Sequence, residues 1–82
     1  MFYVITRTDA TGVSYFTHYL ATWTTNMDNA VTFGSKSAAD ERAKLLSRDW
    51  ETVIEVRAYD GAWIHTAPHT VVSTFTNGKA NA

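Results

Sequence analysis

One stretch of this sequence has the pattern of an amphipathic helix, and residues that favour strands flank it on both sides. Within residues 36–48 the apolar side chains recur at helical spacing and form one narrow stripe of mostly small residues, namely Ala39, Ala43 and Leu46. Ser35, or alternatively Ser37, can cap the first turn by accepting a hydrogen bond from a backbone amide. A helix with small residues on its stripe can approach a sheet closely, so we expect one helix lying across a sheet.

The rest of the chain is rich in Thr, Val, Tyr, Phe and Trp, which favour extended structure. Alternating runs separated by turn residues predict strands at residues 2–8, 13–21, 52–59, 62–66 and 70–76. A short extended run at residues 30–33 leads into the helix, and we expect Trp23 and Phe33 to close the core. The predicted fold class is α+β, with an antiparallel sheet of about five strands and a single helix packed on one face, in the order β-β-α-β-β-β.

The length of 82 residues predicts a single domain over residues 1–82, with a frayed tail at residues 77–82. The chain contains no cysteine, which excludes disulfides and thiolate metal sites. No run approaches the roughly 18 apolar residues of a membrane span, and the N-terminus lacks the pattern of a secretion signal. We therefore expect a cytoplasmic protein without a membrane partner.

The charges of the chain are nearly balanced, with seven basic and eight acidic residues and a formal net charge of −1. A protein that holds nucleic acid through its phosphates usually carries a basic surplus on one face. Direct contact with nucleic acid is therefore not expected. Sheet aromatics can nevertheless stack on bases, so a nucleic-acid-binding accessory or regulatory protein of a phage remains the alternative function.

No catalytic or metal motif stands out from the sequence. His65 and His69 are four residues apart, but Pro68 between them rules out the helical spacing that would place two imidazoles on one face. The segment Gly34-Ser35-Lys36-Ser37 only superficially resembles a nucleophile elbow or a phosphate loop, because helix entry and capping explain its residues. We therefore expect no catalytic residue, no metal, no cofactor and no enzymatic activity.

Large aromatic residues lie on both faces of the first predicted hairpin, and one helix can cover only one face of the sheet. Rings that remain uncovered are candidates for protein contact, since Tyr and Trp are enriched at interface hot spots. Acidic residues in turns could complement a basic surface of a partner, although Asp is common in turns for local hydrogen bonding. The candidate partner-binding residues are Tyr15, Tyr19, Trp63, Asp9, Asp28 and Asp60.

The pattern Trp23-x-x-Asn26-x-x-x-Ala30-x-x-Phe33-x-Ser35-Lys36-Ser37-x-Ala39 follows an aromatic hairpin and precedes a β-rich second half. In size and pattern, residues 2–56 resemble small accessory proteins of phages and mobile elements, some of which are anti-CRISPR proteins. The resemblance implies a stoichiometric, non-enzymatic inhibitor that binds a host protein, such as a bacterial defence complex of the Cascade type, and blocks its access to DNA. It assigns no functional residue. An edge strand at residues 70–76 or an uncovered aromatic face could also pair two copies in a homodimer.

Overall fold

The structure is a computed structural model that describes residues 1–17, 22–50, 52–59 and 69–81. Its elements follow one another along the chain as β1 (Phe2–Asp9), β2 (Gly12–Phe16), β3 (Trp23–Thr24), the 3-10 helix η1 (Met27–Asn29), α1 (Lys36–Trp50), β4 (Ile54–Tyr59), β5 (His69–Thr76) and β6 (Lys79–Ala80).

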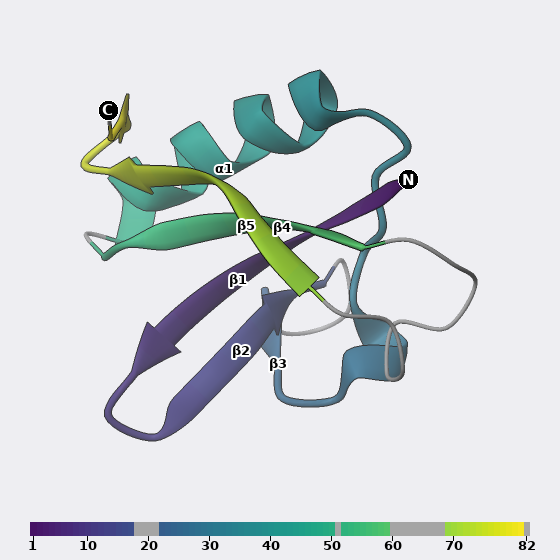
Figure 1. Cartoon of the computed structure of the whole chain (residues 1–82). Helices are drawn as coiled ribbons and strands as arrows, with labels where there is room; N and C mark the ends of the chain where they lie inside the picture. The colour runs from purple at the N-terminus through teal and green to yellow at the C-terminus, as the bar shows by residue number, and fades with distance from the viewer. Residues whose placement is uncertain (18–21, 51, 60–68, 82) are drawn as a thin grey trace.

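The strands form one antiparallel sheet in the order β3-β2-β1-β4-β5-β6, and α1 lies across one face of it (Figure 1). The predicted α+β fold is confirmed, with a six-stranded sheet in place of about five strands. The strands that the sequence did not indicate are the two-residue elements β3 and β6. The predicted strand at residues 62–66 lies outside the described residues, as do residues 18–21 of the predicted second strand.

The helix forms where the sequence predicts it. The Ser35 hydroxyl accepts a hydrogen bond from the Ala38 amide at 3.2 Å, so Ser35 and not Ser37 is the cap. The exposed fraction is 0% for Ala39 and Ala43 and 7% for Leu46, which confirms the apolar stripe. This stripe packs on residues from four strands, namely Ile5, Phe16, Ile54, Val56 and Phe75.

The helix does not cover the whole of its face of the sheet. It packs mainly over β1, β4, β5 and β6, and β2 and β3 extend beside it (Figure 1). On that flank Trp23, Val31 and Phe33 are partly buried against the core. Phe33 pairs with Tyr3 through two backbone hydrogen bonds of 2.8 and 2.9 Å, so the expected extended run at residues 30–33 contributes a single bridge. Trp23 and Phe33 therefore close the core, as predicted.

The face of the sheet away from the helix is not open at its centre. Val4 and Thr6 are fully buried there, and Tyr59 is 5% exposed. Phe2 stacks on the Tyr59 ring with 5.8 Å between the ring centroids. Exposed apolar side chains remain only toward the margins of the described part of this face, where Phe2 and Val71 are each 44% exposed. The centre of this face is therefore buried, and the described residues leave uncovered apolar groups at its margins.

The prediction of a frayed tail at residues 77–82 is wrong for residues 77–81, which form a turn, the strand β6 and one further hydrogen-bonded residue. Asn77 and Gly78 adopt positive φ angles of 52° and 80°, as a tight hairpin turn between β5 and β6 requires. β6 pairs with the end of β5, and the Asn81 amide donates to the Thr74 carbonyl at 2.8 Å. Asn-Gly is a strong hairpin signal, so this turn could have been predicted from the sequence.

A buried hydroxyl group ties this hairpin to the helix. Ser47 is fully buried; its Oγ donates to the Lys44 carbonyl at 2.8 Å and accepts from the Gly78 amide at 2.9 Å. The hydrogen bond from the Gly78 amide joins residues 31 apart in sequence and holds the β5–β6 turn beside the last turns of α1.

We expect Ser47→Ala to lower the free energy of unfolding by about 1–3 kcal/mol, because the Gly78 amide loses its acceptor in a partly buried place. Urea denaturation followed by circular dichroism measures this change. Ser37→Ala is the matched control, since Ser37 is exposed in the first turn and should change stability by no more than about 0.5 kcal/mol. Equal losses for the two variants would contradict the role given to Ser47.

Candidate protein-binding surface

The structure does not gather the sequence-predicted residues into one site. Tyr15 is half-buried near the end of β2, on the face away from α1, where it pairs with Thr6 and Thr24. Asp9 ends β1, and Asp28 lies exposed in η1. The remaining candidates, Tyr19, Asp60 and Trp63, lie outside the described residues.

The Asp9 carboxylate is engaged in the β1–β2 turn. Its Oδ1 accepts from the Thr11 hydroxyl at 2.6 Å and from the Thr11 amide at 2.8 Å, and its Oδ2 lies 3.5 Å from the Arg7 guanidinium. The hydrogen bonds from Thr11 favour the charged carboxylate and lower the pKa of Asp9 below the ordinary value of an aspartate. Turn formation, the alternative weighed for such acids, therefore accounts for Asp9.

Asp28 also belongs to a local turn structure. Its backbone amide donates to Oδ1 of Asn26 at 3.0 Å, and Asn26 is the N-cap of η1. This capping explains why a polar segment between Trp23 and the helix folds back in one short turn. The side chain of Asp28 remains on the exposed surface of that turn.

Two arginines and two aromatic rings instead lie next to one another on the flank that the helix leaves uncovered, where Phe16 is 5% exposed and the Arg7 side chain is 21% exposed. The Arg7 guanidinium lies 5.1 Å from the centre of the Trp23 ring, and the Trp23 ring meets Phe16 edge-on with centroids 6.1 Å apart. The Arg42 guanidinium lies 5.9 Å from the centre of the Phe16 ring. We call Arg7, Trp23, Phe16 and Arg42 the arginine–aromatic cluster.

Backbone register explains this arrangement. Arg7 lies opposite Ser14 and Ile54 on the helix-side face of the sheet, two residues after the buried Ile5. Phe16 pairs with Trp23 across β2 and β3, so both rings share that face. Arg42 reaches the same place from α1, because it precedes the buried Ala43 and borders the apolar stripe. The cluster therefore joins the helix to the strands that the helix does not cover.

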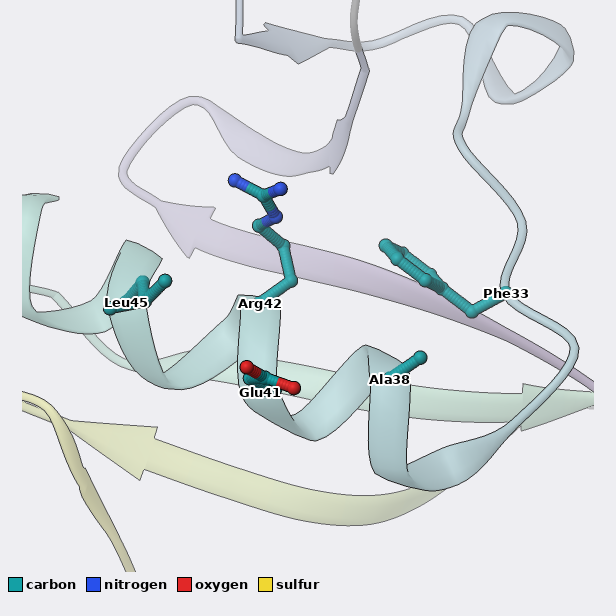
Figure 2. Close-up of a pocket in the computed structure, with 5 residues that line it drawn as sticks. All are labelled: Phe33, Ala38, Glu41, Arg42 and Leu45. Carbon is teal, nitrogen blue, oxygen red and sulfur yellow. The ribbon is translucent and has the colours of Figure 1, made fainter.

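A pocket of about 310 Å³ adjoins this cluster and shares Arg42 with it. Its lining is Phe33, Ala38, Glu41, Arg42 and Leu45. Figure 2 shows the Phe33 ring extending from the segment before α1 toward the side of the helix that carries Ala38 and Arg42. Leu45 is 41% exposed at the pocket, so an apolar group that bound there would cover side chains that now face water.

A second hollow of about 580 Å³ lies between α1 and β6, lined by Asp40, Glu41, Lys44, Phe75, Gly78, Lys79 and Ala80. Its charged residues are of both signs, and Asp40 also forms a 2.7 Å ion pair with Lys36. It carries no cation stacked on an aromatic ring among the interactions of the described residues. The first pocket, with its neighbouring cluster, is therefore the better candidate for recognition.

The described residues contain no group of three or more histidine, aspartate or glutamate side chains placed to hold a metal ion. Of the three histidines, His18 and His65 lie outside those residues, and the His69 ring packs at 5.6 Å from the Tyr59 ring. No helix in the described part of the chain is long and apolar enough to cross a membrane. Comparisons with models of protein families, with curated proteins and with solved structures found no match to this chain.

The sequence analysis did not identify this cluster. It placed Trp23 and Phe33 in the core, where they are indeed partly buried, and passed over Arg7 and Arg42. The alternation of β1 could have indicated Arg7, because it shares a face with Ile5. The position of Arg42 next to Ala43 could likewise have placed it at the border of the helix stripe.

We expect Thr11→Val to raise the pKa of Asp9 toward the ordinary value of an aspartate, because the strongest hydrogen bond to its carboxylate is lost. A side-chain titration by NMR measures this pKa in both proteins. Since the folded-state pKa is lowered, the interaction stabilises the native state above the unfolded-state pKa and is lost as the pH falls through the folded-state value. If the pKa of Asp9 is unchanged in the variant, the hydrogen bond from the Thr11 hydroxyl is not the cause of the lowered pKa.

Proposed function

We propose that this protein is a small, non-enzymatic inhibitor that acts by binding another protein through the arginine–aromatic cluster and its adjoining pocket. The observation that carries the proposal is the row of contacts from Arg7 through Trp23 and Phe16 to Arg42, next to a pocket of about 310 Å³. Arg and Trp are among the residues that dominate interface hot spots, which are packed around pockets that a partner side chain fills.

The chemistry of the surface suits a protein partner. An arginine held over an aromatic ring keeps its hydrogen-bond donors directed outward while its flat face is packed, so less side-chain freedom is lost on binding. Arg42 has an exposed side chain at the rim of the pocket, where it can bind a carboxylate or carbonyl group of the partner. The apolar lining contributed by Phe33, Ala38 and Leu45 would accept a hydrophobic side chain next to that group.

The partner we propose is a host protein complex of bacterial defence, of the Cascade type, whose access to DNA the inhibitor blocks in the host cytoplasm. This part of the proposal is supported by the resemblance of residues 2–56 to small phage proteins. The balanced charge of the chain fits an inhibitor that covers a surface, rather than one that imitates a DNA backbone with many acidic groups.

We expect Arg42→Glu to weaken capture of the partner at least about tenfold, because loss of a hot-spot residue typically costs about 2 kcal/mol or more and each 1.4 kcal/mol is about a factor of ten. The measurement is affinity capture from the cytosol of the producing cell, quantified by mass spectrometry and repeated with the purified partner. Arg48→Glu is the matched control, with the same charge change on the same helix at a side chain that is 67% exposed away from the pocket. If both variants lose capture, or both retain it, the partner does not bind through this surface. If the wild-type protein enriches no protein, the proposed inhibitor function is wrong.

A defence-interference assay tests the identity of the partner. Cells with an active Cascade-type system are transformed with a targeted plasmid, with and without the protein, and the number of transformants is counted. We expect the wild-type protein and Arg48→Glu to restore transformation and Arg42→Glu to fail. Restoration by all three proteins would place the inhibitory contact elsewhere, and no restoration by any of them would reject this class of partner.

A nucleic-acid-binding accessory protein is the second candidate, and the stacking of Arg7 on Trp23 is the observation that favours it. Single-stranded nucleic acids bind through base stacking on aromatic rings and through cationic side chains. This candidate predicts a mobility shift of single-stranded DNA or RNA at low salt that weakens steeply as salt is added. Absence of a shift at low salt would reject it.

A further inference from the structure

Among the described residues, the outer side of β5 is paired over only part of its length. β6 pairs with β5 only at Phe75 and Thr76, and the next contact on that side is the bond from the Asn81 amide to the Thr74 carbonyl. Over residues 70–73, the described part of the chain places no strand on the outer side of β5. The outward-pointing backbone groups of such an edge are a template for another strand.

This edge lacks most of the features that keep sheet edges apart. Between His69 and Thr76 there is no lysine, arginine, aspartate, glutamate or proline. The protective feature that is present is a β-bulge, where Val56 pairs with Ser73 and Arg57 pairs with Val71. The side chains of Val71 and Val72 are 44% and 37% exposed at the same place. An uncharged edge with exposed valines is suited to pairing with another uncharged strand.

We propose that a second copy of this chain pairs with β5 around Val71, antiparallel and about a two-fold axis, to form a homodimer with a continuous sheet. Antiparallel pairing about a two-fold axis is self-complementary, so one strand can serve both sides of the interface. A register centred on Val71 places this residue opposite its own copy and Thr70 opposite Val72. That register brings valines into contact and sets no charge against a like charge, which makes this chain's own β5 the occupant that fits.

The proposal is independent of the inhibitor function, because it concerns the other edge of the sheet. The sheet order places β3, and with it Trp23 of the arginine–aromatic cluster, at one end, and β5 and β6 at the other. A failure of the dimer would leave the proposed binding surface unaffected, and the reverse also holds.

The oligomeric state of the full chain provides the first test. Light scattering after size exclusion, together with sedimentation velocity, is run from about 1 µM to about 1 mM, since dimer formation depends on protomer concentration. We expect the mass to rise from the monomer value of 9.2 kDa toward twice that value. A mass that stays at the monomer value over the whole range would overturn the proposal.

Charge substitutions at the centre of the interface test its location. Val71→Lys and Val71→Glu should each shift the dissociation constant at least about tenfold toward monomer, because like charges then face each other across the two-fold axis. An equimolar mixture of the two variants should recover the dimer, since opposite charges meet. Circular dichroism confirms that each variant is folded before the masses are compared.

The matched control is Val53→Lys. Val53 is a similarly exposed valine, at 47%, that lies between α1 and β4 and outside the strands. The Val53→Lys variant should dimerise as the wild-type protein does. Two results would overturn the assignment to this edge. The first is a dimer that persists unchanged in Val71→Lys. The second is a loss of dimer in Val53→Lys as large as that in Val71→Lys.

Discussion

The close contact between two alanines of α1 and the central strands is the constraint on which the rest of the structure depends. Ala39 and Ala43 are completely buried, and only residues of that size let a helix backbone lie so near the sheet. Ile5, Ile54 and Val56 fill the space on the sheet side. In an 82-residue chain the core is thin, so this contact sets where the helix lies and how far it reaches.

The position of the helix in turn creates the candidate binding surface. A single helix centred over β1, β4 and β5 cannot also cover the β2–β3 side, so side chains of the loop and the strands must close the core there. Trp23 and Phe33 do so as large rings that are only partly buried. The guanidinium of Arg7 lies over the Trp23 ring from the sheet, and Arg42 of the helix lines the same pocket as Phe33. The arginine–aromatic cluster is thus a direct consequence of a narrow helix stripe.

The elements with strong periodicity could be predicted from the sequence. The features that depend on strand register could not. The stripe of Ala39, Ala43 and Leu46 and the Ser35 cap were predictable, because helix spacing and capping are local properties. The cluster was not predicted, because it needs the pairing of Phe16 with Trp23, and a two-residue strand such as β3 carries no detectable alternation. The β6 hairpin is different in kind, because Asn77-Gly78 is a local turn signal that is present in the sequence itself.

The two proposed surfaces lie at opposite ends of the sheet order, and their combination would affect how tightly the protein binds a partner. A dimer joined through the β5 edge would leave the flank beside β3 free on both copies, so each dimer would present two arginine–aromatic clusters. A partner with repeated subunits could then be held at two points, and the second contact would form at a high effective concentration. Such avidity compensates for a small interface, because each cluster and its pocket offer only a few anchoring side chains. A protein of this size can in that way bind tightly without a larger core or a broader contact surface.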